Sequence, residues 1–359
     1  MHTAVPIWGF ISPENKFMIE EYKTSSKDSS MANVYITDRG NLRYVEIKGF
    51  HRVAFGKAAQ ESAFEIFFSK ELLEKIVKVK KEWFKDEIDR SELLTYLELP
   101  LKSYLQRFSI NLDDKIILDF GCGSGASSVI LGKLGGKKIV GIDTQECSIE
   151  IAKLRARDYS LTDKIDFLCL HETRSLPFKN GSFEIVLCNG VIEHMPPEER
   201  RIYIKELWRL LTPGGYILVH ETPNRLWPID SHTTGLPLVP YMSPRLAMKF
   251  AVMFSKRIRS DASLEELIAK GLRGSTYWEI LNPIKHDNPI VLNDSTEKDI
   301  DIFFRLQLLR NSAFLKRGAI ITLWVFYKVL HQVLFRPIRM PSCAFLPWLT
   351  ICLQKRKRI

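Results

Sequence analysis

The chain has 359 residues, of which 45% are hydrophobic and 26% are Asp, Glu, Lys or Arg. This composition excludes a chain that is disordered throughout, and it suffices for one large core or for a core with an accessory domain. The formal net charge is +10, but no Asp or Glu follows Asp301, so the excess positive charge belongs to residues 302–359.

The cysteines and the N-terminal sequence indicate a reducing compartment. The six cysteines form no C-x-x-C pair, and four of them fall in apolar stretches that are typical of a core. The first apolar stretch, residues 4–11, is short, contains Pro6 and follows no basic run, so it does not predict a secretory signal. We therefore expect a cytoplasmic protein.

The first 108 residues predict a hairpin followed by helices. Residues 34–36 and 42–47 flank a turn with nearly alternating apolar residues, which predicts a β-hairpin. Residues 71–84 and 91–108 place apolar side chains at spacings of three and four, which predicts helices. Pro100 is expected to break or kink the second helix.

From Lys115 onward, short apolar runs alternate with helical patterns. The predicted strands are 116–120, 138–142, 165–170, 183–188 and 216–220, and the predicted helices are 129–134, 149–159 and 200–211. This alternation predicts right-handed βαβ crossovers and a parallel sheet, and therefore an α/β fold. After Glu221, five prolines interrupt a loop-rich segment, which we expect to be an active-site insertion.

The string ILDFGCGSGA, residues 117–126, is the most informative motif. A strand runs into Gly121, Gly123 and Gly125 and a helix follows, as expected where the backbone turns tightly and approaches a ligand closely. Dinucleotide sites share a loose form of this glycine pattern. However, Asp119 precedes the first glycine by two residues. Its carboxylate would repel a pyrophosphate but tolerates a ligand with cationic amino and sulfonium groups.

The order of motifs resembles the class I S-adenosylmethionine (SAM)-dependent methyltransferases, in particular the small-molecule subgroup that includes quinone-biosynthesis enzymes. Besides the glycine loop, an acid follows the second strand, LPF precedes the fourth and TPGG precedes the fifth. The resemblance covers about residues 112–225. It implies a Rossmann-like, mostly parallel seven-stranded sheet and SAM as the cofactor.

The same resemblance implies which residues hold SAM. The loop from Asp119 to Gly125, including Cys122, would pack against the methionyl part. Asp143, followed by Thr144, would accept hydrogen bonds from the ribose hydroxyls, because a carboxylate offers two acceptor oxygens. Two further positions follow from the motif order: Glu172 and Thr173 would lie beside the adenine, where relatives more often have Asp-Ala, and Asn189 would lie near the reacting methyl group.

Methyl transfer to a neutral hydroxyl benefits from a general base, and histidine is the usual choice. His194 follows the fourth strand in the string VIEHM. His232 lies among Asn224, Asp230 and Thr233, in a segment that resembles bacterial methyltransferases of sugars, glycan precursors or related small molecules. The alternatives are a histidine that only lines the site and a structural loop. No H-x-x-x-H or clustered Cys/His pattern occurs, so we expect no metal.

Residues 302–359 are both basic and apolar. The apolar stretch 318–335 is shorter than a bilayer span, and a second stretch follows at 340–353. Apolar segments with cations and no acids suit a helix in a membrane interface, where anionic head groups attract the basic side chains. A lid or dimer helix on the sheet is the alternative, and the segment is more apolar than a nucleic-acid surface needs.

Together these patterns predict four regions and one activity. The regions are 1–108 (hairpin and helices), 109–225 (SAM-binding core), 226–301 (substrate-pocket insertion and remaining core) and 302–359 (basic tail). The expected activity is transfer of a methyl group from SAM to a small-molecule, glycan or lipid-linked acceptor, preferentially at oxygen. A non-catalytic SAM-binding partner protein and an NAD-dependent oxidoreductase are the alternatives.

Overall fold

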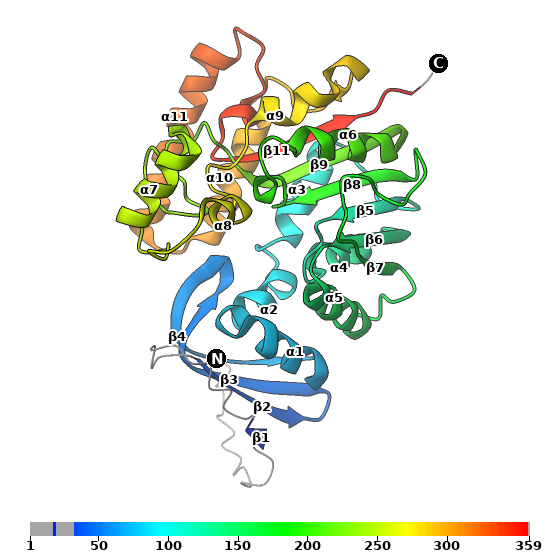
Figure 1. Ribbon diagram of the computed structural model, residues 1–359, viewed down its shortest axis with the longest axis vertical. Helices are drawn as coiled ribbons and strands as arrows, with labels where there is room; N and C mark the ends of the chain where they lie inside the picture. The colour runs from blue at the N-terminus through cyan, green and yellow to red at the C-terminus, as the bar shows by residue number, and fades with distance from the viewer. Residues whose placement is uncertain (1–16, 19–31, 358–359) are drawn as a thin grey trace, which may run out of the picture. The chain divides into compact units, whose positions relative to one another are not determined.

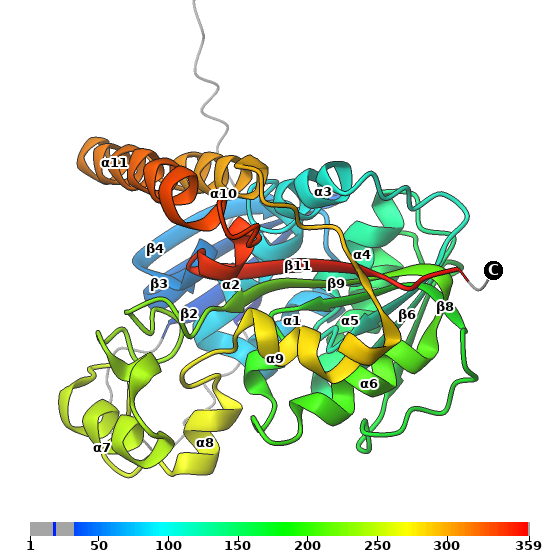
Figure 2. The same cartoon turned by 90° about the horizontal axis from the view of Figure 1, so that it is seen from above.

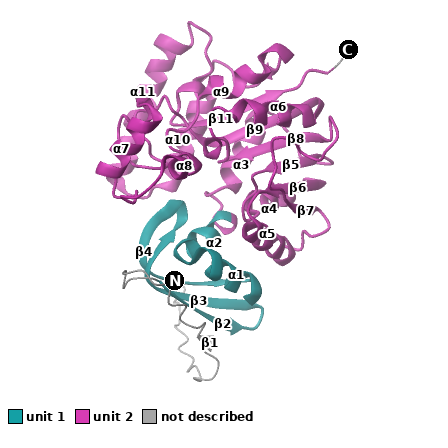
Figure 3. Ribbon diagram, viewed as in Figure 1, with its two compact units in different colours: residues 1–90 teal, residues 91–359 magenta. Residues whose placement is uncertain are grey.

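The computed structural model describes residues 17–18 and 32–357 and divides into two compact units, residues 1–90 and 91–359 (Figures 1 and 3). The apolar stretch 4–11 and the last two residues of the chain lie outside the described residues. The boundary between the two units thus follows residue 90, whereas the sequence predicted it after residue 108. Helix α3 joins the second unit because its Leu101 and Tyr104 pack in the same apolar cluster as the main sheet.

Unit 1 contains an antiparallel sheet in the order β1-β2-β3-β4, followed by two helices. The predicted hairpin is confirmed, with Val34 opposite Ile47. The fourth strand was not predicted, because the only large apolar side chains in its sequence KAAQESAFEI are Phe64 and Ile66, near its end. The elements are β1 (Phe17–Met18), β2 (Asn33–Arg39), β3 (Leu42–Val53), β4 (Lys57–Ile66), α1 (Lys70–Lys80) and α2 (Phe84–Glu92).

Unit 2 is built on a seven-stranded sheet in the order β10-β11-β9-β8-β5-β6-β7. β9, β8, β5, β6 and β7 run parallel, whereas β11 is antiparallel to β9 and to β10. The predicted mostly parallel α/β sheet is confirmed. The strands are β5 (Ile116–Phe120), β6 (Lys138–Asp143), β7 (Ile165–Cys169), β8 (Phe183–Asn189), β9 (Leu211–Pro223), β10 (Ile290–Val291) and β11 (Trp348–Gln354).

Helices cover both faces of this sheet (Figure 2). α3, α4, α5 and α10 pack on the face that carries Ile117, Leu187 and Leu218. α6 and α9 pack on the face that carries Leu118 and Val219. The helices are α3 (Glu98–Arg107), α4 (Ala126–Lys133), α5 (Glu146–Asp158), α6 (Arg200–Leu210), α7 (Pro244–Phe254), α8 (Leu264–Ala269), α9 (Tyr277–Leu281), α10 (Lys298–Arg310) and α11 (Phe314–Leu330).

Two expectations about this unit are corrected. Pro100 does not break a helix, because α3 begins at Glu98 and a proline is tolerated in a first turn, where N–H groups lack intrahelical partners. The loop-rich segment after Glu221 contains the helices α7, α8 and α9.

The basic C-terminal segment is not a separate tail. Its second apolar stretch contains β11, whose Leu349, Ile351 and Leu353 are fully buried in the sheet core. Its first stretch begins earlier than predicted: α11 and the π-helical turn after it run continuously from Phe314 to Phe335, 22 residues. The predicted division at residue 301 therefore separates α10 and β11 from the unit to which they belong.

Candidate active site

The glycine loop joins β5 to α4 in a conformation that requires glycine. Gly121, Gly123 and Gly125 have φ angles of +71°, +52° and +80°, in the left-handed region. A Cβ on Gly125 would also lie 2.7 Å from the Ala152 Cβ. The backbone N–H groups of Gly121 and the buried Cys122 both donate to the Ile142 carbonyl, at 2.9 and 3.0 Å, which holds the loop against β6.

Asp119 lies buried beneath this loop, and only one of its two carboxylate oxygens accepts hydrogen bonds from the described residues. Its Oδ2 accepts hydrogen bonds of 2.6 Å from the hydroxyls of Ser127 and Ser128. Its Oδ1 has no hydrogen-bond partner among the described residues. Burial raises the pKa of this carboxyl to about 6. A buried acceptor of this kind fits a cationic group of a bound ligand, as the resemblance implies for the amino group of SAM.

Asp143 ends β6 and helps to shape the same loop. Its Oδ2 accepts from the Gly123 N–H and its Oδ1 from the Gln145 N–H, each at 2.9 Å. Each carboxylate oxygen can accept a second hydrogen bond, so the side chain keeps capacity for two ribose hydroxyls. Thr144 beside it is exposed.

The remaining predicted cofactor residues lie on two elements. Glu172 and Thr173 lie on the loop after β7, where exposed Glu172 accepts a 2.7 Å hydrogen bond from the Arg174 N–H. Asn189 is the last residue of β8, and its buried Oδ1 has no partner among the described residues. A second unpartnered oxygen thus lies at the carboxyl edge of the sheet, where ligands of open α/β folds bind.

The structure brings the two candidate histidines together. Their ring centroids are 5.4 Å apart, although His194 follows β8 and His232 follows β9. His194 Nδ1 donates to the Ala269 carbonyl at 2.8 Å, and its Nε2 lies 3.9 Å from Oε1 of buried Glu193. Gly271 passes beside them, where a Cβ would lie 2.9 Å from His232 Cδ2 and 3.0 Å from Glu193 Cγ.

Glu193, His194 and His232 form a group that was not foreseen. Each offers one metal-ligating atom, and these atoms lie within 4.8 Å of one another. A carboxylate with two imidazoles is a set that can hold a divalent metal. No metal was predicted because the sequence has no Cys/His cluster at short spacings, whereas here the fold joins two distant segments.

The other polar residues around His232 have structural partners. Asp230 accepts hydrogen bonds from the backbone N–H groups of Thr233 and Thr234 and from the Thr234 hydroxyl. The Thr233 hydroxyl donates to the Lys270 carbonyl. The Asn224 amide donates to the carbonyls of residues 344 and 346. These three residues therefore hold the loop that carries His232.

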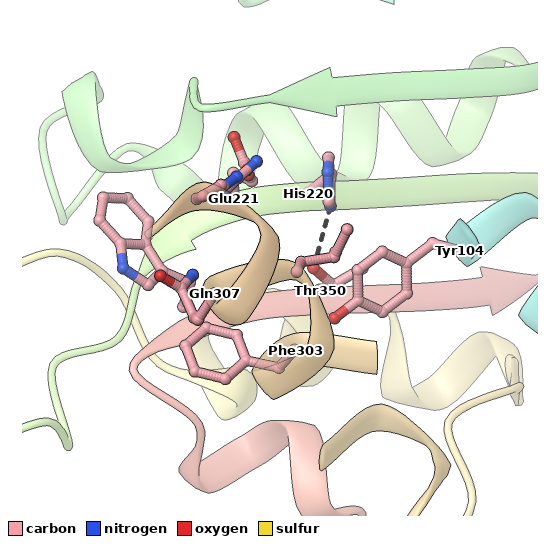
Figure 4. A pocket seen from close by; sticks show the side chains of 9 residues that line it. Tyr104, His220, Glu221, Phe303, Gln307 and Thr350 are labelled. Carbon is pink, nitrogen blue, oxygen red and sulfur yellow. Dashed lines mark hydrogen bonds and ion pairs between the residues drawn. The ribbon is translucent and has the colours of Figure 1, made fainter. Parts of the chain in front are cut away.

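His220 was missed by the sequence analysis. It lies near the carboxyl end of β9, is 1% exposed and lines a small hollow together with Tyr104 and Thr350 (Figure 4). Its Nδ1 lies 2.9 Å from the Thr350 Oγ1, and its Nε2 has no partner among the described residues. The available signal was an ionisable residue at the end of the buried run YILVH.

Comparison with known proteins also indicates a methyltransferase. Residues 117–215 match the family described as a methyltransferase domain. A ubiquinone biosynthesis O-methyltransferase from Idiomarina loihiensis is 27% identical over 213 residues, which cover 57% of this chain and 79% of that protein. A demethylmenaquinone methyltransferase from Lactococcus lactis is 33% identical over 115 residues, 32% of this chain and 44% of that protein.

Among solved structures, a SAM-dependent methyltransferase from Methanosarcina mazei is 33% identical, with 31% of this chain and 54% of that chain covered and a TM-score of 0.29. The oxidoreductase alternative gains no support from these matches, and the expected cofactor is SAM. The glycine loop, the unpartnered Asp119 oxygen and the matched family model lead to one conclusion: residues 117–215 form a SAM-dependent methyltransferase domain of the class I type.

Proposed function

We propose that the chain methylates a hydroxyl oxygen on an aromatic ring of the quinone-precursor type. The named relatives support this class, because one is a ubiquinone biosynthesis O-methyltransferase and another a 2-methyl-6-phytyl-1,4-hydroquinone methyltransferase. Rings of this type carry hydroxyl groups and an isoprenoid tail. A glycan or lipid-linked precursor is the second class, suggested only by the segment around His232.

The paired histidines are the observation that carries the choice of oxygen. Because His194 Nδ1 donates to a carbonyl, Nε2 is the atom that can accept a proton. The carboxylate of Glu193 lies 3.9 Å from this nitrogen. His232 stands beside it and can receive or position the same hydroxyl. Such a base serves an oxygen acceptor, whose proton must leave as the methyl group arrives.

The loop residues would hold the cofactor beside this pair. SAM supplies an electrophilic methyl group on its sulfonium centre when bound. Asp119 Oδ1 would accept a hydrogen bond from the cationic amino group, and Asp143 would bind the ribose. Asn189, at the tip of β8, would mark the side on which the acceptor lies. The chain's own contribution is to align the two partners and to accept the proton.

Single substitutions at the two histidines test the proposal. With methyl-labelled SAM and 4-hexylcatechol as the acceptor, His194→Ala or His232→Ala is expected to lower kcat/KM about a hundredfold, within the range for loss of a general base. SAM affinity, measured by calorimetry, should change less than threefold. His286→Ala is the matched control, because His286 is exposed on the turn that follows α9.

Two results would contradict the proposal. The first is wild-type activity in both histidine variants. The second is loss of activity with EDTA and recovery with a divalent metal, which would assign Glu193, His194 and His232 to metal binding instead of proton transfer.

We further propose that α11 places the enzyme at an anionic membrane surface, facing a reducing compartment. Exposed apolar side chains lie along this helix, among them Phe314 (88% exposed), Leu315 (85%) and Phe326 (56%). The opposite face stays on the protein: Tyr327 is buried in a cluster with residues of α10, and Lys328 pairs with Glu297 and Asp301. This division between two faces favours a helix lying in the interface over one that crosses the bilayer.

A further inference from the structure

Three side-chain atoms that have no hydrogen-bond partner among the described residues lie on one face of the sheet. Asp119, Asn189 and His220 each follow, by two residues, a side chain in the same core cluster: Ile117, Leu187 and Leu218. Because side chains alternate along a strand, all three point to that face, at the carboxyl ends of the adjacent strands β5, β8 and β9. Asp119 and Asn189 already have roles in the proposed function, beside the cofactor and the acceptor. His220 has none.

The surroundings of His220 are largely apolar and aromatic. Its ring packs edge-on against Tyr104, with centroids 5.2 Å apart, and Phe303, Leu306 and Trp348 contribute to the same hollow (Figure 4). The hollow has room for about one or two water-sized groups. A neutral imidazole with one unpartnered nitrogen in such a wall costs stability unless a ligand atom or a water satisfies it.

The charge of the site also limits what can bind there. Burial lowers the pKa of His220 to about 4, so the ring is neutral at physiological pH. The nearby carboxylate of Glu221 is paired with Arg310 at 2.7 Å. The hollow therefore presents a neutral ring and a closed ion pair, which favours a neutral oxygen substituent over an ionised group.

The hydrogen bonds of the Thr350 hydroxyl allow His220 Nε2 either to accept a hydrogen bond from a ligand hydroxyl or to donate one to it. The Thr350 hydroxyl contacts His220 Nδ1 and also shares a hydrogen bond with Tyr104. A hydroxyl can donate or accept, so Nδ1 can be either the protonated or the bare nitrogen of the neutral ring. His220 Nε2 can accordingly accept from an incoming hydroxyl or donate to it.

The hollow adjoins the proposed catalytic pair. Trp348 lines the hollow, and its ring lies 5.9 Å, centroid to centroid, from the ring of His232. Glu221, which also lines the hollow, has a φ of +51°, a strained conformation for a residue with a Cβ. Trp348 therefore borders both the histidine pair and the hollow that His220 lines.

We propose that His220 Nε2 hydrogen-bonds a second hydroxyl group of the acceptor, the one that is not methylated, and so selects dihydroxylated rings over monohydroxylated ones. This inference rests on the proposed function, since it concerns the acceptor of the same site. The role of His220 is recognition. His194 and His232 receive the proton.

Binding to the full-length chain saturated with S-adenosylhomocysteine tests this without turnover. The probes are 4-hexylcatechol, 4-hexylresorcinol and 4-hexylphenol, and the readout is Kd by calorimetry. The wild type should bind at least one dihydroxylated probe about five- to tenfold more tightly than 4-hexylphenol, the gain expected from one hydrogen bond. His220→Phe should reduce that preference to less than twofold, whereas His286→Phe, at an exposed position outside the hollow, should keep it.

Thr350→Val is the second variant, for the case that His220→Phe does not fold. It removes the hydroxyl that fixes the imidazole and should reduce the preference at least twofold. Equal binding of all three probes by the wild type, binding of none, or a preference that survives at both positions would overturn the inference. Methyl transfer is measured separately on the same samples. A His220-dependent preference without any transfer would therefore refute the proposed function and leave this recognition site standing.

Discussion

Asp119 is the residue whose charge the cofactor site depends on most. With a pKa near 6 in the unliganded chain, its carboxyl is ionised at pH 7.5 and becomes protonated as the pH falls through 6. Protonation removes the negative charge that would attract the SAM amino group. The affinity for SAM should therefore fall about tenfold for each pH unit below 6.

Calorimetric titration with SAM between pH 5 and 8 measures this dependence. Asp119→Asn should bind SAM more weakly at pH 7.5 and show a flat profile. Adenosine, which lacks the amino acid part, should bind the wild type with little dependence on pH. A pH-dependent profile that persists in Asp119→Asn would assign the titration to another group.

At the scale of single residues, the sequence predicted those site residues whose roles depend on neighbours close to them in the chain. Asp119 and the three glycines lie within residues 119–125, and Asp143 ends the next strand, so their roles can be inferred from spacing and motif order. His220 could not be found in that way. Its importance comes from Thr350, 130 positions away, and from an unpartnered nitrogen that only packing reveals.

Among the elements, α11 allows the clearest test of the membrane proposal. Phe314→Ser with Leu315→Ser replaces two of its most exposed apolar side chains. This double variant should lose at least half of its flotation with vesicles that contain anionic lipid, because the buried apolar area supplies much of the binding energy. Ile202→Ser, at an exposed apolar position on α6, is the matched control.

Circular dichroism and SAM affinity should be unchanged in these variants. Equal flotation of wild type and double variant would count against the proposal. Truncation after Asp301 is not a suitable alternative, because it would delete β11 from the centre of the β9-β11-β10 edge of the sheet.

The helices and strands also show why some parts of the fold can be predicted from the sequence and others cannot. The parallel strands β5–β8 are short apolar runs bounded by turns, which is what strands buried on both faces require, and their predicted bounds agree closely. β11 was missed because the apolar stretch 340–353 that contains it was assigned to the basic segment expected in a membrane interface. α7 was missed because prolines dominate its surroundings, although Pro244 stands at its first position, where proline is favoured.

In the folded molecule, part of the positive charge of residues 302–359 is taken up by contacts within the protein. Several cations of the basic segment have structural partners: Arg310 pairs with Glu221, Lys328 with Glu297 and Asp301, and Lys355 donates to the carbonyls of residues 208 and 211. The positive charge is therefore only partly available to a lipid surface, and apolar contact must supply the rest of the proposed attraction.

The central claim is that unit 2 seats SAM at the carboxyl edge of its sheet, with the glycine loop on one side and the tip of β6 on the other. A crystal structure of the full-length chain with S-adenosylhomocysteine tests it most directly. We expect the ribose hydroxyls within hydrogen-bond distance of Asp143 and the amino group within that distance of Asp119 Oδ1. Density for the nucleoside anywhere else, or a ribose that does not touch Asp143, would contradict it.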